Sequence, residues 1–266
     1  MSRRSELRAL LAFAGLGWRQ AREQRIGLAG QCILYVIVLA IFWKLWNATP
    51  LQELGAAAPS AAELVWYLVV TEWIVFACGA RYREVETDIL SGAIESGLPR
   101  PLPYALATMA RWLGFTAFQT AALVIVGSAC GWWLTGTLPV ALAILPWLAL
   151  SVVLAILLTL LCHLQLGYVA IWLRSSAPAF WVWQKLLFVL GGLLLPLTLY
   201  PGLLEIAAKA SPFASMLYAP ASLILESSVG HVCWPLGAQL FWIAVLAWCA
   251  WAVDRRAIRH LVSVGT

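Results

Sequence analysis

The sequence predicts an all-α integral membrane protein with six transmembrane helices. Of the 266 residues, 63% are hydrophobic and 11% are charged, and the mean hydropathy is +0.87. A soluble domain has about a quarter of its residues charged. The apolar residues form continuous runs, and a helix needs roughly 20 of them to cross a bilayer. Inside hydrocarbon every backbone polar group needs an internal partner, which helices provide. The expected spans are 28–46, 63–80, 105–134, 140–173, 180–200 and 233–253.

The distribution of basic residues predicts how the chain is oriented. All but two of the 17 Lys and Arg residues lie in or beside the N-terminus, the segments 81–111 and 174–185, and the C-terminus. The two exceptions are Lys44 and Lys209. Cytoplasmic loops of membrane proteins carry an excess of Lys and Arg. We therefore expect a multi-pass protein of the cell (inner or plasma) membrane with both termini in the cytoplasm.

The first segment, residues 1–27, is too polar to cross a bilayer. Leu7, Leu11 and Trp18 recur at helical spacing among Arg residues, which is typical of a helix lying at the cytoplasmic membrane interface. A disordered basic tail is the alternative. Because the first apolar run begins only after six Arg residues, no cleavable signal peptide is expected. Residues 28–253 form the expected transmembrane domain, in contact with membrane lipids.

The polar side chains of Glu72, Gln119 and His163 lie within the expected spans. Glu72 lies in the second span, and a carboxylate there is costly, so it marks either a substrate or gating site or a structural hydrogen bond. Gln119 in the third span is expected to bond a neighbouring helix. His163 in the fourth span is expected to be a satisfied polar contact, because no second His or carboxylate lies at metal-ligand spacing.

The second half of the chain contains the longest expected external segment, residues 201–232. It is too apolar for a free loop and too short for two full crossings. We expect short helices that break at Ser211–Pro212 and re-enter the outer leaflet. In the fifth span, Pro196 is expected to kink the helix. The candidate pathway or gating residues are Glu72, Gln119, Pro196, Pro212 and Phe213. Residues 254–266 form the expected cytoplasmic tail.

The sequence contains no motif for covalent chemistry. It has no phosphate-binding loop of the G-x-x-x-x-G-K-[ST] type, no H-E-x-x-H and no G-x-S-x-G. The six Cys residues form no C-x-x-C pair, so neither a disulfide framework nor a metal site is indicated. The Arg residues border apolar spans, so nucleic acid is not an expected partner. We expect a chain that is not an enzyme and binds no cofactor itself. A membrane-embedded enzyme or assembly factor acting on a lipid is the alternative, and a stand-alone secondary transporter or channel is a further one.

The most polar interruption between two apolar runs is Arg81–Tyr104, on the expected cytoplasmic side. It holds four of the 12 acidic residues, namely Glu84, Glu86, Asp88 and Glu95. Acidic residues early in a helix are favoured by the helix dipole, and the Pro-rich turn after them would stiffen the return to the third span. A soluble partner is expected to bind this segment 81–104, and an ordinary solvated loop is the alternative.

This segment resembles the loop after the second span in ABC exporter permeases of the six-span type-2 family. There, a charged short helix is followed by a Gly and a Leu-x-Arg-Pro-like signature. The matching residues are Glu84-Val85-Glu86-Thr87-Asp88-Ile89-Leu90-Ser91-Gly92 and Leu98-Pro99-Arg100-Pro101-Leu102. Gly192–Pro220 is similar to that family's fifth span, Pro-Phe break and re-entrant external helices. Pro99 and Pro103 depart from the pattern and make the turn unusually rigid.

The resemblance implies a permease subunit of an ATP-driven exporter. Its substrate would be amphipathic and lipid-like, a glycan or a drug, moved out of the cytoplasm or the inner leaflet. Two separate ABC ATPase subunits would bind ATP and Mg and couple through a helix at 84–97. A second permease, identical or a related six-span chain, would complete the complex. The implied ATPase-coupling residues are Glu84, Glu86, Asp88, Ile89, Gly92, Glu95, Leu98, Arg100 and Pro101.

Overall fold

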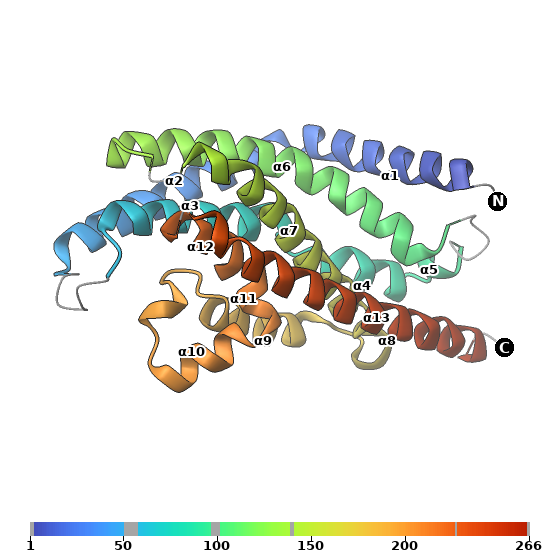
Figure 1. Cartoon of the computed structure of the whole chain (residues 1–266). Coiled ribbons are helices and arrows are strands. Elements are labelled where there is room, and N and C mark those ends of the chain that lie inside the picture. The colour runs from blue at the N-terminus through green and yellow to red at the C-terminus, as the bar shows by residue number, and fades with distance from the viewer. Residues whose placement is uncertain (1–2, 51–57, 97–101, 139–140, 227, 265–266) are drawn as a thin grey trace.

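A computed structural model describes residues 3–50, 58–96, 102–138, 141–226 and 228–264. All regular elements among these residues are helical (Figure 1). Five helices in the described chain are long and apolar enough to cross a membrane: Arg25–Ala48, Ala61–Leu90, Tyr104–Thr135, Leu142–Leu173 and Cys233–Val253. The all-α membrane class is therefore confirmed, whereas the count of six spans stays a prediction.

The helices fall into long spanning elements and short connecting ones. The first half contains α1 (Arg3–Glu23), α2 (Arg25–Ala48), α3 (Ala61–Cys78), α4 (Tyr82–Leu90), α5 (Ala93–Ser96) and α6 (Tyr104–Thr135). The second half contains η2 (Leu142–Ile144), α7 (Leu145–Tyr168), α8 (Ala170–Leu173), α9 (Ala177–Leu190), η3 (Leu197–Leu199), α10 (Gly202–Lys209), α11 (Pro212–Met216), α12 (Tyr218–Leu225), η4 (Val229–His231) and α13 (Cys233–Val264). Helix α13 thus continues through most of the predicted tail.

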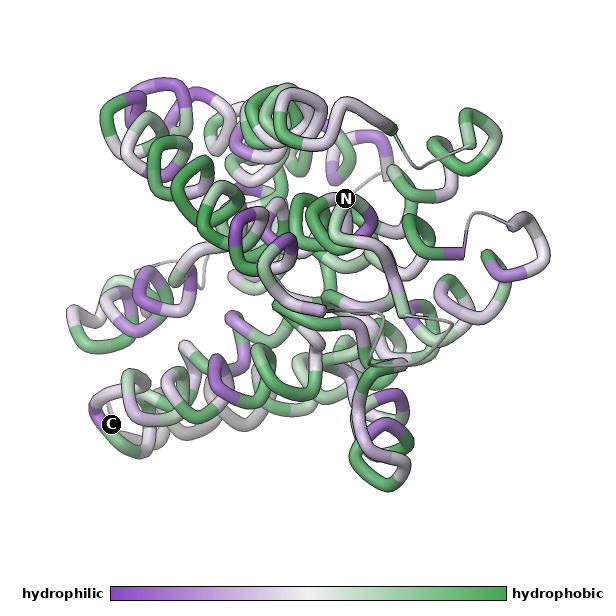
Figure 2. Tube along the Cα trace, turned by 90° about the vertical axis from the view of Figure 1, so that its left-hand side faces the viewer, coloured by the Kyte–Doolittle hydropathy of each residue, from purple (hydrophilic) through white to green (hydrophobic). Residues whose placement is uncertain are grey.

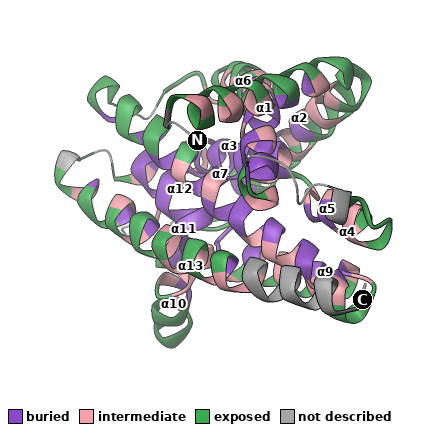
Figure 3. Cartoon of the chain, turned by 90° about the vertical axis from the view of Figure 1, so that its right-hand side faces the viewer, coloured by how far each residue is buried: buried purple, intermediate pink, exposed green. Residues whose placement is uncertain are grey.

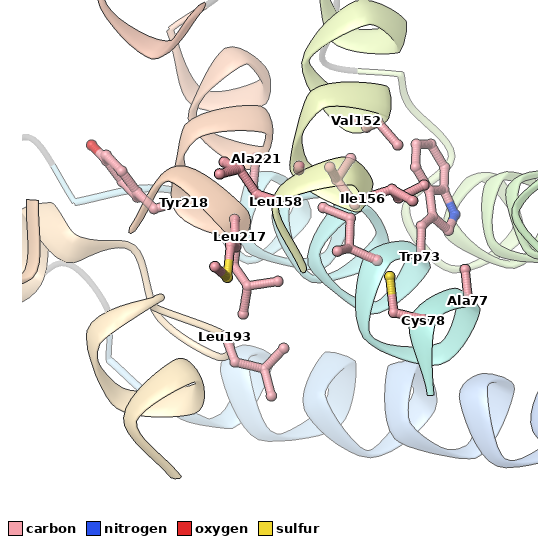
Figure 4. Packing of buried hydrophobic residues seen from close by; sticks show 14 of the residues in the cluster. Trp73, Ala77, Cys78, Val152, Ile156, Leu158, Leu193, Leu217, Tyr218 and Ala221 are labelled. Carbon is pink, nitrogen blue, oxygen red and sulfur yellow. The ribbon is translucent and has the colours of Figure 1, made fainter. Parts of the chain in front are cut away.

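Helices α3 and α7 form the buried centre of the molecule, and α12 packs against both (Figure 3). Trp73 of α3 and Ile156 of α7 belong to the hydrophobic cluster at this centre, together with Leu217 and Ala221 from the segment after α10 (Figure 4). Helices α2 and α13 lie at the periphery, because only 11% of the apolar stretch of each is buried inside the protein. Apolar residues occupy many of the outer turns of the molecule (Figure 2). Ile26 of α2 is 92% exposed. Such apolar outer faces suit contact with lipid.

The helix in the predicted fifth span is shorter than expected. Helix α9 has 14 residues, fewer than the roughly 20 that a crossing needs. It ends at Gly191 and Gly192, and Gly192 has a φ of +66°, a left-handed conformation that glycine adopts without steric cost. Helix α3 binds the departing chain, because the Thr71 hydroxyl donates to the carbonyl of Leu193 at 3.0 Å. The helix therefore ends before Pro196, so the predicted kink is wrong, and Pro196 instead precedes η3.

The segment 201–232 contains short helices with a break where the sequence predicts one. Helix α10 ends at Lys209 and α11 begins at Pro212, which occupies the first turn, where its missing N–H costs nothing. The described residues form a further short helix, α12, in which Tyr218–Ile224 are all buried. Re-entry into the outer leaflet stays a prediction.

Both chain termini lie at the same end of the bundle as α4, α5 and α8 (Figure 1). The end of α2, the start of α3 and the end of α6 lie at the opposite end. The last turns of α2, which contain Lys44, and helix α10, which contains Lys209, lie away from the termini. The grouping of the elements at two ends thus matches the one predicted from charge. Their orientation relative to the cytoplasm is still a prediction.

Helix α1 packs along the first half of α6 (Figure 1). The two backbones touch at Gly17 and Gly114: a Cβ at Gly17 would overlap the Arg111 carbonyl, and one at Gly114 would overlap the Ala14 carbonyl. Trp18 adds an edge-on ring contact to Phe118, with ring centroids 5.1 Å apart. Since glycine lets helix backbones approach closely, α1 and α6 form a tight pair.

Candidate functional site

Two glycines separate α4 from its neighbours. After α3, Gly79 has a φ of +51° and its N–H donates to the Val75 carbonyl at 3.1 Å, which closes the helix. After α4, Gly92 has a φ of +72° and begins the turn to α5. Positive φ favours glycine over every residue with a Cβ. The chain therefore places a short helix at the end of the bundle that holds both termini.

The inner face of α4 packs on α7 and α9. Tyr82 is buried and stacks on Phe180 of α9, with ring centroids 4.4 Å apart. Val85 is also buried, and it lies so close to Gly167 of α7 that a Cβ at Gly167 would overlap it. These two side chains give α4 a fixed base.

Glu84 connects α4 to α6. Its carboxylate pairs with Arg81 at 2.8 Å and with Arg111 of α6 at 3.1 Å. The indole N–H of Trp112 donates to the same carboxylate at 2.9 Å. The Arg81 guanidinium lies over the Phe115 ring, 3.6 Å from its centroid, in a cation–π geometry. One carboxylate thus receives donors from both helices.

Glu86 connects α4 to α9, and Asp88 adds a second connection to α6. The backbone N–H of Ser176 donates to Glu86 at 3.1 Å, and Ser176 is the N-cap of α9, where a negative charge is favourable. The Tyr104 hydroxyl at the start of α6 donates to Asp88 at 2.6 Å. Sequence reasoning assigned these carboxylates to a partner protein. The structure brings each of them to a donor elsewhere in the same chain, and their role in contact with a partner stays a prediction.

The other predicted coupling residues fall into three groups. Ile89 is half-buried against the hydrophobic core, and Gly92 is exposed in the turn after α4. Glu95 belongs to α5, but its side chain lies outside the described residues. Leu98, Arg100 and Pro101 also lie outside the described residues.

The outer face of α4 comprises Arg83, Thr87, Leu90 and Ser91, which are all exposed. Their spacing places them on one side of a helix. Leu90 is 56% exposed and lies beside polar neighbours, and the helix is exposed on this side (Figure 3). The sequence signal for this face was the three- and four-residue spacing of its members.

The candidate pathway residues lie in separate elements. Glu72 of α3 is 6% exposed and lies close enough to Tyr35 of α2 for electrostatic interaction. Gln119 of α6 donates to Gln31 of α2 at 3.4 Å, so the expected bond to a neighbouring helix is confirmed. Pro196, Pro212 and Phe213 lie in the chain between α9 and α12.

Two buried polar residues have surroundings that the sequence did not predict. Gln239 of α13 is fully buried and donates to the carbonyls of Ser151 and Ser215, at 2.9 and 3.1 Å. Gln239 therefore joins α7, α11 and α13. In the sequence, the only indication of this role was a side-chain amide within an apolar run. The expectation that His163 has a polar partner is wrong, because neither ring nitrogen has one among the described residues. Phe180 and Trp183 of α9 pack on the imidazole instead.

Comparison with curated proteins found none that matches this chain. The family model described as "ABC-2 family transporter protein" matches residues 59–265. The match includes every helix from α3 onward, and therefore α4, its inward carboxylates and its outer face. The protein is accordingly a multi-pass membrane protein and the membrane component of a transporter, and the chain belongs to the ABC-2 transporter family.

Proposed function

We propose that this chain is the permease subunit of an ATP-driven exporter, and that α4 and α5 form its contact with separate ATPase subunits. Membership of the ABC-2 family implies an ABC transporter with ATPase partners. The observation that carries the proposal is the geometry of α4. The helix lies at the end of the bundle with both termini, turns one face outward, and is bonded through its other side to α6, α7 and α9.

A helix that receives motion from a partner needs an exposed face and a rigid base. The outer face offers an apolar centre, Leu90, with Arg83 and Thr87 beside it, which resembles the core and rim of a small protein interface. The base includes the ion pairs of Glu84 and the bond of Glu86 to the N-terminus of α9. A displacement of α4 would therefore act on α6 and α9 together.

The remaining parts of the proposal concern assembly and transport. Two ATPase subunits would bind ATP and Mg, and a second permease, identical or related, would face this one across the pathway. Both termini would be cytoplasmic in a cell (inner or plasma) membrane. Helix α9 and the chain up to residue 200 would supply a sixth crossing, and segment 201–232 would re-enter the outer leaflet. The cargo would be amphipathic and lipid-like, a glycan or a drug, exported from the cytoplasm or inner leaflet.

The test is the affinity of the permease for the ATPase that purifies with it. Leu90→Ser removes an apolar side chain from the proposed contact, and losing the burial of a Leu costs about 1.5–3 kcal/mol. We expect ATPase affinity to fall at least tenfold. The matched control is Leu203→Ser in α10, a residue that is 87% exposed and lies away from the termini. Unchanged affinity in Leu90→Ser, or an equal loss in the control, would reject the proposal.

A further inference from the structure

A cavity of about 210 Å³ lies between α3, α7 and α9, next to the turn from α3 into α4. Its walls include Val75, Gly79, His163, Phe180, Trp183 and Gln184. None of the described residues that line it is charged. It is separate from the outer face of α4, and none of the predicted coupling or pathway residues lines it.

His163 is the unusual residue of this cavity. It is 1% exposed, yet neither Nδ1 nor Nε2 has a hydrogen-bond partner among the described residues. A neutral imidazole offers one donor and one acceptor. Leaving a buried polar group unsatisfied costs about 1–3 kcal/mol. The nearby Thr159 hydroxyl donates its proton to the Ala155 carbonyl at 2.9 Å, so it has none left for the bare imidazole nitrogen, and it forms no hydrogen bond with the ring N–H either. A bound molecule would supply the missing partner.

The walls restrict what that molecule can be. Phe180 and Trp183 present aromatic rings, and the imidazole packs edge-on against Trp183 with centroids 4.8 Å apart. A cavity of about 150 Å³ accepts benzene, so this one has room for a single ring with a short substituent. The lack of charge on the described walls favours a neutral molecule. A hydroxyl suits a neutral imidazole, since it can donate to the bare nitrogen or accept from the N–H.

We propose that this cavity binds a small uncharged phenol or aromatic alcohol, with its hydroxyl on His163 and its ring against the walls formed by Phe180 and Trp183. The site lies beside the Gly79 turn and under α9, whose N-terminus bonds Glu86. Its occupancy would therefore fill the space between α3, α7 and α9, next to the turn into α4. Binding here requires neither the ATPase nor transport, so the proposal is tested independently of the coupling role.

The chain contains three His residues, which makes ring-nitrogen spectroscopy selective. The full chain, labelled with ¹⁵N-histidine and held in lipid bilayers, would be titrated with 4-ethylphenol. We expect a saturable shift of one pair of ring signals, which His163→Phe removes, while the signals of His231 and His260 stay in place. Ethylbenzene is matched in size but lacks the hydroxyl, and it should leave the hydrogen-bond-sensitive shift unchanged.

A second pair of variants keeps His163 in place. Val75→Phe fills the cavity from α3 and should weaken 4-ethylphenol binding at least tenfold. Val153→Phe adds the same ring on α7, where Val153 is 57% exposed and lies outside this cavity, and should leave binding unchanged. A shift that never saturates, or that persists in Val75→Phe, overturns the proposal. So does a His163 ring that is already bonded to water and unaffected by 4-ethylphenol.

Discussion

Glu84 receives three donors from two helices, and this concentration of contacts gives it a positioning role. Arg81, Arg111 and Trp112 all bond its carboxylate. The side chain is 37% exposed, so solvent weakens the two ion pairs, and partly exposed pairs contribute about 0–1 kcal/mol each. Arg83, one residue earlier, is exposed on the outer face. Adjacent residues thus have different tasks: one fixes α4 and the other is available to a partner.

Glu84→Gln should loosen α4 without altering its outer face. Glutamine loses both ion pairs but still accepts from the Trp112 N–H. A cost of about 1 kcal/mol would raise amide hydrogen exchange within α4 roughly fivefold. Exchange mass spectrometry of the purified permease measures this directly. ATPase affinity should change less than twofold.

Arg83→Gln is the matched comparison and should give the opposite pattern. Because Arg83 is exposed on the outer face, exchange within α4 should stay unchanged while ATPase affinity falls. If Glu84→Gln leaves amide exchange in α4 unchanged, or if Arg83→Gln raises it equally, the proposal that Glu84 holds α4 in place while the outer face contacts the ATPase is incorrect.

At the residue scale, the sequence identified where the acidic residues lie but not what they contact. Composition and position identified the segment of Glu84, Glu86 and Asp88. Their donors, such as Arg111 and Ser176, are distant in the chain, and spacing cannot reveal such pairs. The prediction of a polar partner for His163 was wrong for a related reason: the aromatic residues that pack on it come from α9, which is distant in the sequence.

At the element scale, the pairing of α1 with α6 depends on two glycines. Gly17 and Gly114 allow backbone contact that no Cβ permits. The spacing of apolar residues predicted a helix at 1–27. A single sequence does not reveal contacts between distant segments, so it could not predict that this helix packs beside α6. Helix α6 has 32 residues, about 48 Å at 1.5 Å per residue, so it exceeds the roughly 30 Å hydrocarbon core. Its excess length gives α1 a surface on which to pack.

Gly114→Ala should force α1 and α6 apart. Overpacking costs about 1–3 kcal/mol, and the better helix propensity of alanine offsets up to about 1 kcal/mol of that. We therefore expect a net loss of stability, measured as a lower unfolding temperature of the purified protein. Gly15→Ala in α1 is the control, because nothing lies within 4 Å of a Cβ there, and it should be neutral or stabilising. Equal stability of the two variants would contradict the close packing.

The length of α9 also belongs to this scale. The apolar run 180–200 is continuous in hydropathy, so periodicity gave no sign that the helix stops at Leu190. What ends it is the left-handed Gly192 together with the bonds that α3 makes to the chain beyond. Such tertiary hydrogen bonds cannot be predicted from a single sequence. The break at Ser211–Pro212 could be predicted, because proline lacks a backbone N–H and disrupts a helix wherever it occurs in the interior.

At the scale of the whole molecule, charge and hydropathy predicted the class and the grouping of elements at two ends. Both termini, α4 and α5 lie together, and the last turns of α2 (with Lys44) and helix α10 (with Lys209) lie away from them (Figure 1). The number of membrane crossings was less predictable. It depends on α9, whose 14 residues are fewer than the roughly 20 that a crossing helix needs. The family match from residue 59 onward supports the transporter role.

The most direct test of the coupling role is site-specific photo-crosslinking in the intact transporter. A photoreactive amino acid would replace Leu90 on the outer face of α4 and, separately, Leu203 in α10, both large exposed apolar residues. The crosslinked partners would be identified by mass spectrometry. We expect the probe at Leu90 to capture the ATPase subunit and the probe at Leu203 to capture none. An ATPase crosslinked from Leu203, or none from Leu90 in a complex that still hydrolyses ATP, would contradict the assignment of α4 as the coupling helix.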